Sequence, residues 1–223
     1  MRFQITEGVR RLGVHGAFAV LTGLDNTCYP AALEAFRDAL DARLRCELVP
    51  GFIDGDPVLQ GFRDLHDAVR RSNKRFPSSA EALVSLYQRK GLVPRINALV
   101  DIYNAVSLET RLSLGAHDVA KLDGDVTLKL ADGSERFVPL GTSDPEPIHP
   151  GEYVYADDSN EVICRLEHRQ CEKTKVTAAT TACFYIIQGS RATSDQVVRA
   201  ALARLEDLTR RFCGGGQGEV WIA

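Results

Sequence analysis

Three polar side chains, Asp101, Asn104 and Ser107, interrupt an otherwise apolar stretch at intervals of three residues. At this spacing they share one side of a helix. A buried helix face avoids a carboxylate and an amide unless partners satisfy their hydrogen bonds. The pattern therefore predicts either a structural polar network or one wall of a pocket. Asp101 alone fits better as an anchor for backbone or for a neighbouring cation than as a general base.

A nearby histidine adds a group that can hold or donate a proton. His117 precedes Asp118 and, of the five histidines, stands beside a carboxylate close to this polar stretch. A lone histidine is more often a surface or hydrogen-bonded core residue than a catalytic one. The sequence has no Gly-x-Ser-x-Gly or His-Glu-x-x-His motif, and the glycine-rich run at 214–218 lacks the Gly-Lys-Ser/Thr of a phosphate loop. Motifs alone therefore specify no reaction.

The six cysteines are not spaced as a metal site. None forms a Cys-x-x-Cys pair, and no histidine cluster completes a zinc site. Several stand among apolar neighbours, where cysteine behaves as a small core residue. We expect reduced structural thiols, no metal and no cofactor.

Positive charge gathers between residues 70 and 95, although the formal net charge of the chain is −3. Seven Lys or Arg side chains in this stretch are opposed by one acid, Glu81. A solvated face and a contact for phosphate explain the patch equally well. A second basic group follows a predicted strand. Its members are Arg165, His168, Arg169, Lys173 and Lys175.

The composition is that of a soluble globular protein, with 44% apolar and 26% charged residues. No segment approaches the ~20 apolar residues that span a bilayer. The first residues carry an early acid and no apolar signal core, so we expect a cytoplasmic protein without a membrane anchor.

The elements that position these residues are readable from periodicity. Helices are predicted after Pro30, after Asp56-Pro57, from a capping box at Ser78 and Glu81, from Pro94, and over 195–211. Strands are predicted at 16–22, in a hairpin of 126–130 with 136–140, in a second hairpin of 152–157 with 161–167, and at 219–223. Residues 182–188 form an apolar run that suits a central strand buried on both faces. We expect one α+β domain over residues 1–223, mostly helical before residue 115.

Three segments carry a recognisable order of residues. They are Ser-Asn-Lys-Arg-Phe-Pro-Ser-Ser-Ala-Glu-Ala-Leu (72–83), Asn-Ala-Leu-Val-Asp-Ile-Tyr-Asn-Ala-Val-Ser-Leu (97–108) and Gly-Ala-His-Asp (115–118). Segments 162–165 and 172–177, with Thr180, continue the same order. Together they resemble the free-standing B3/B4 domain family, single-domain relatives of the editing module in the phenylalanyl-tRNA synthetase β-chain. The resemblance covers roughly residues 60–210.

The resemblance implies layered helices on a mostly antiparallel sheet, with a pocket for the aminoacylated 3′ end of a transfer RNA. In the synthetase, the module hydrolyses the ester of tRNA wrongly charged with tyrosine. Asn104 falls on the family's pocket asparagine, whereas Gly115 stands where the synthetase has a histidine. The strand at 183–187 lacks the glutamate that reads the tyrosine hydroxyl. Selecting a hydroxyl by a factor of about 10⁴ needs a dedicated hydrogen-bond partner, so tyrosyl-tRNA is not the expected substrate.

Ester hydrolysis needs a positioned water and donors for the developing oxyanion rather than a side-chain nucleophile. We expect Asn104 and His117 to act on the ester and the water. Binding contacts are expected from Lys74, Asp101, Ser107 and Arg165. The leading hypothesis is a trans-editing ester hydrolase that acts on misacylated tRNA, needs no cofactor and associates with a synthetase. The alternatives are a non-catalytic module that binds RNA or an amino-acid-like ligand, and a polar trio that only joins helix to sheet.

Overall fold

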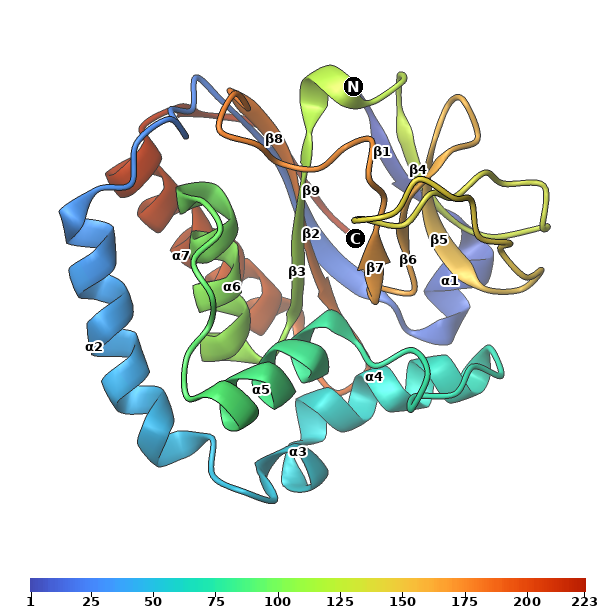
Figure 1. The fold of residues 1–223 in the computed structure, drawn as a ribbon. Coiled ribbons are helices and arrows are strands. Elements are labelled where there is room, and N and C mark those ends of the chain that lie inside the picture. Colours follow the sequence, from blue (N-terminus) through green and yellow to red (C-terminus); the bar gives the residue numbers. More distant parts are fainter.

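Two β-sheets lie face to face, and helices cover the outer side of one of them (Figure 1). The computed structural model describes residues 1–223, except for the side chain of Gln217. The five-stranded sheet has the order β1 (Phe3–Ile5), β4 (Val126–Leu130), β5 (Tyr153–Asp157), β6 (Val162–Arg165), β7 (Arg169–Gln170). The four-stranded sheet has the order β3 (Ser113–Asp118), β8 (Ala182–Gly189), β2 (His15–Thr22), β9 (Gly216–Ile222). β1 pairs with β4 in parallel, and the other described strand pairs are antiparallel.

Helices α6 (Ala98–Thr110) and α7 (Asp195–Cys213) pack on the outer face of the four-stranded sheet. Helix α2 (Ala31–Glu47) lies outside them, and its Phe36 ring contacts Phe212 of α7. The remaining helices are α1 (Glu7–Leu12), α3 (Phe52–Gly55), α4 (Pro57–Ala68), α5 (Ser79–Lys90) and the 3-10 turn η1 (Val119–Lys121). The predicted class, α+β with layered helices on a mostly antiparallel sheet, is confirmed.

Strand β8 is the central strand that its apolar run predicts. It pairs with β3 on one side and β2 on the other. Phe184 and Ile186 face the five-stranded sheet, whereas Tyr185 and Ile187 face the helices. Both faces are buried, which explains why the run shows no alternation of apolar and polar residues.

Side-chain caps set the starts of the two helices around the candidate site. Helix α5 begins as predicted, because Ser78 Oγ accepts a hydrogen bond from the Glu81 N–H at 3.2 Å. Helix α6 does not begin at Pro94. Its cap is Asn97, whose side chain accepts from the Val100 N–H at 3.1 Å. The segment 91–97 is therefore a loop, and it becomes one wall of a cavity.

The predicted hairpin between 126–130 and 136–140 is wrong. Residues 136–140 form no named strand and contact the sheet through isolated bridges at Arg136 and Pro139. Pro139 has no N–H for a continuous ladder, and β4 pairs with β5 instead. The second predicted hairpin is confirmed as β5 with β6.

Within the described chain, no helix combines the length and apolarity needed to cross a membrane. The six cysteines are free thiols, four of them buried. Among the described side chains, no group of three or more His, Cys, Asp or Glu is arranged to hold a metal ion.

Candidate functional site

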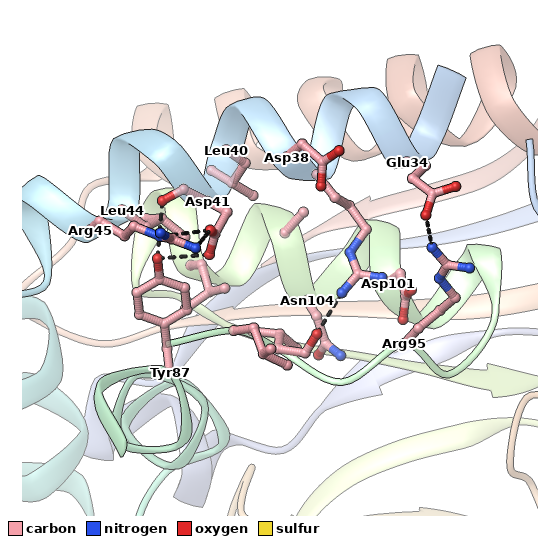
Figure 2. Close-up of a pocket in the computed structure, with 15 residues that line it drawn as sticks. Glu34, Asp38, Leu40, Asp41, Leu44, Arg45, Tyr87, Arg95, Asp101 and Asn104 are labelled. Carbon is pink, nitrogen blue, oxygen red and sulfur yellow. Dashed lines mark hydrogen bonds and ion pairs between the residues drawn. The ribbon is translucent and has the colours of Figure 1, made fainter. Parts of the chain in front are cut away.

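Two cavities lie on either side of helix α6, and Asn104 lines both. The sheet cavity, of about 290 Å³, is walled by α6, β3, β8 and the turn between β6 and β7. The helix cavity, of about 370 Å³, lies between α2, α6 and the loop 91–97 (Figure 2). Volumes of this order are typical of small-ligand sites.

The Asn104 amide is available to a ligand. The side chain is partly buried, yet it makes no hydrogen bond to any described residue. Its helix is fixed by Leu99, Ile102 and Val106, which are buried against the four-stranded sheet. A rigid helix thus presents both an N–H donor and a carbonyl acceptor at the boundary of the two cavities.

His117 lines the sheet cavity together with Asn104. The ring is fully buried on β3, and its Nδ1 lies 2.7 Å from Thr174 Oγ1. Thr174 Oγ1 lies 3.0 Å from Cys171 Sγ. Burial lowers the pKa of His117 to about 3, so the ring is neutral at pH 7. Its Nε2 is buried without a protein partner among the described residues.

Gly115 lies on β3 beneath the side chain of Gln170. A Cβ at position 115 would come within 2.5 Å of Gln170 Nε2. Both residues line the sheet cavity. The place where the resemblance puts a synthetase histidine is therefore filled by an amide from β7.

A buried carboxylate that no sequence pattern predicted also lines the sheet cavity. Glu167, at the β6–β7 turn, is 4% exposed. Its Oε1 accepts from His66 Nε2 at 2.8 Å, and its Oε2 accepts from Gln188 Nε2 at 2.9 Å. Burial opposes the charge on His66, but the Glu167 carboxylate and two backbone carbonyls raise the His66 pKa above its usual value. This carboxylate is held by partners far away in the sequence.

The other members of the predicted polar trio make structural contacts. Asp101 Oδ2 accepts from Tyr29 Oη at 2.8 Å and from Arg37 Nη1 at 2.7 Å. Burial raises the Asp101 pKa despite these partners. Ser107 Oγ donates to the Leu112 carbonyl at 2.8 Å, and Ser107 lines neither cavity. Asp101 lines the helix cavity only, so the trio is not a single site.

Arg165 and Lys74, expected to contact phosphate or ribose, differ in exposure. Arg165 is 4% exposed, and its guanidinium donates two hydrogen bonds to Glu152, at 2.8 and 2.9 Å. It stacks over the Phe76 ring and lines neither cavity. Lys74 is exposed on the loop before α5. Of these two, only Lys74 presents a charge to solvent.

The B3/4 domain model matches residues 67–214. The chain belongs to the B3/4 domain family. This confirms the resemblance stated from the sequence segments. The phenylalanine–tRNA ligase β subunit of Fusobacterium nucleatum subsp. nucleatum is 34% identical over 90 residues, 40% of this chain and 11% of that protein. The chain therefore spans about a tenth of this curated relative.

A solved structure resembles the B3/4 chain over most of its length. It is an N-terminal fragment of the phenylalanyl-tRNA synthetase β-subunit from Pyrococcus horikoshii, with 15% sequence identity and a TM-score of 0.47. The match covers 92% of this chain and 49% of that chain.

Proposed function

We propose that this B3/4 protein is an aminoacyl-tRNA deacylase that acts in trans on misacylated tRNA. The observation that carries the proposal is that Asn104 and His117 line one cavity of about 290 Å³, and that neither the Asn104 amide nor His117 Nε2 has a hydrogen-bond partner among the described residues. The synthetase relatives supply the substrate class, the aminoacylated 3′ end of tRNA. The same relationship motivates association with a synthetase as the source of substrate.

In the proposed reaction, water adds to the acyl carbon and the bond to the terminal ribose oxygen breaks. The proton from water ends on that oxygen, which leaves free amino acid and a tRNA with a free hydroxyl. The Asn104 amide N–H donates to the developing oxyanion. One such donor is worth roughly 3–4 kcal/mol in the transition state.

His117 acts in this proposal as a neutral donor. Burial raises the Cys171 pKa, so the thiol keeps its proton and can donate to Thr174 Oγ1. The Thr174 hydroxyl then donates to His117 Nδ1, which leaves the ring proton on Nε2. With a pKa of about 3, His117 suits donation to an oxyanion or a bound water better than proton abstraction.

The aminoacyl side chain would lie against the apolar part of the sheet cavity, formed by Leu114, Cys164 and Ile186. Glu167 adds a carboxylate to this wall, but both its oxygens already accept hydrogen bonds from protein. Each carboxylate oxygen keeps a second lone pair, so Glu167 can still accept a hydrogen bond from a ligand. The proposal that the substrate carries an amino acid other than tyrosine therefore rests on the strand at 183–187, which has no glutamate.

A panel of correctly and wrongly charged tRNAs, incubated with purified protein, tests this function. Loss of ester on one mischarged tRNA, much reduced in Asn104→Ala and retained in Asn73→Ala, would support it. Asn73 is a suitable control because it lines neither cavity. Intact ester on every tRNA, measured with protein shown to be folded, would reject it.

Binding without turnover is the second candidate function. It is favoured by the replacement of the synthetase histidine with Gly115 and by the low basicity of His117. A tRNA or an amino-acid-like ligand that protects the sheet cavity, with no ester loss on any species, would support this alternative.

A further inference from the structure

The helix cavity takes no part in the proposed hydrolysis, although it is the larger of the two and shares Asn104 with the sheet cavity. Figure 2 shows charged side chains of α2 and of the loop 91–97 around it. They belong to Glu34, Arg37, Asp38, Asp41, Arg45, Arg95 and, from α6, Asp101.

Ion pairs cancel most of this charge. Each guanidinium has an acidic partner: Arg37 pairs with Asp101, Arg45 with Asp41, and Arg95 with Glu34. Four carboxylates and three guanidiniums line the cavity, so one negative charge is left. It belongs to Asp38, an exposed residue of α2 for which the described residues offer no hydrogen-bond or ion-pair partner.

The rest of the lining is apolar. Leu40 and Leu44 of α2 face Ala105 and Leu108 of α6 across the cavity. Leu92, on the loop, is 53% exposed at its edge. An apolar ligand body between the helices would remove this surface from water.

We propose that the helix cavity binds a small organic amine, with its apolar body between α2 and α6 and its ammonium group at Asp38. The charge selects a cation, because the guanidiniums are already paired and the one unpaired charged group in the lining is an anion. The ligand body would also lie against Asn104, which lines both cavities. Amine binding and ester binding in the sheet cavity are then coupled through one side chain, and the coupling is reciprocal.

Hexylamine and phenethylamine are suitable probes, with hexanol and phenethyl alcohol as uncharged counterparts. Binding would be followed by the backbone amide resonances of α2 and α6 and by the side-chain amide of Asn104. The amines should give saturable shifts at these positions, and the alcohols should bind more weakly. Equal affinity of amine and alcohol, shifts confined to other surfaces, or no saturable shift at millimolar concentration would overturn the proposal.

Two substitutions at exposed positions of the helix cavity test which residues bind the amine. Asp38→Asn should weaken amine binding by about fivefold, the upper end for an exposed ion pair, whereas Glu47→Gln on the same helix should leave it unchanged. Leu92→Lys adds a positive charge at the cavity edge and should also weaken amine binding. An unchanged affinity in both Asp38→Asn and Leu92→Lys would contradict the assigned site.

The binding part of this proposal does not depend on the proposed hydrolysis, whereas the coupling does. If the deacylation screen is negative and the amines still bind, the function fails and the amine site stands. If deacylation is observed, an amine at the concentration that saturates the wild type should change KM for the ester, and it should change KM less in Leu92→Lys. Deacylation with no amine binding would reject the amine site and leave the proposed hydrolysis standing.

Discussion

The side-chain amide of Gln170 lies 2.5 Å from the point where a Cβ on Gly115 would stand. These residues come from different sheets, β7 and β3, and both line the sheet cavity. Gly115 thus leaves room for the Gln170 amide where the two sheets approach each other, at the position where the resemblance puts a histidine in the synthetase module.

Gly115→Ala should lower the free energy of unfolding by about 1 kcal/mol, the low end for an overpacked site, because the displaced atom is the end of a flexible side chain. In a Gln170→Ala background the same change should cost much less. Urea unfolding of both single variants and the double variant measures this coupling. Additive effects would show that the two side chains do not compete for the same space.

Asn104→Ala should separate activity from stability. The amide makes no protein hydrogen bond, so its loss should change unfolding by no more than about 0.5 kcal/mol. If it stabilises the oxyanion, kcat/KM for ester hydrolysis should fall by roughly 10²–10³. Single-turnover deacylation and thermal unfolding would be measured on the same preparation. A marked loss of stability with little loss of rate would assign Asn104 a structural role.

Arg165 and Lys74 should respond in opposite ways to removal of their charge. Arg165→Ala removes two hydrogen bonds from the buried Glu152 carboxylate, which keeps its ion pair with Arg71, and should cost about 2 kcal/mol of stability. Lys74→Ala should leave stability unchanged and reduce the salt dependence of tRNA binding by about 0.7 in slope. Denaturation and salt titrations of tRNA affinity distinguish the two. A stable Arg165→Ala variant with weakened tRNA binding would show that Arg165 contacts tRNA and has no structural role.

His117 should make the fold sensitive to acid. Its pKa is about 6.5 in an unfolded chain and is lowered to about 3 by burial in the fold. Between these values the unfolded state binds the proton and the native state does not. The contribution of His117 to stability is therefore complete above about pH 6.5 and is lost as pH falls towards 3, by up to about 1.4 kcal/mol per pH unit.

His117→Gln should flatten this part of the stability profile, and His149→Gln, at an exposed position, should not. Urea unfolding at several pH values between 7 and 4 makes the comparison. Equal slopes in the wild type and His117→Gln would show that His117 does not titrate with unfolding.

Local patterns in the sequence were sufficient to predict many of the helices and strands. The apolar run of β8 and the Ser78 cap of α5 depend on neighbours within a few residues, so they could be predicted. For the site, the family resemblance pointed to Asn104 alone, and His117 was chosen because it stands beside Asp118 close to the polar stretch.

The features that could not be predicted from the sequence depend on contacts between residues that are far apart along the chain. Glu167 enters the sheet cavity from a tight turn, with φ of 37°, and is held by His66, 101 residues earlier. Arg165 looked like a surface cation because nothing in the sequence identifies Glu152 as its buried partner. The helix cavity depends on α2, in the part of the chain where the resemblance was least diagnostic.

The pairing of β1 with β4 has a consequence for the order in which the protein can fold during synthesis. Phe3–Ile5 pair with residues 126–128, while β2, the next strand along the chain, needs β8 at 182–189. Phe3 also stacks on Phe18 of β2, with ring centroids 3.9 Å apart. β1 and β2 must therefore wait until residues 126–128 and 182–189 have been made before they can form these pairs. Such non-local pairing slows folding, so the apolar segment 17–21 stays unpaired until β8 has been made.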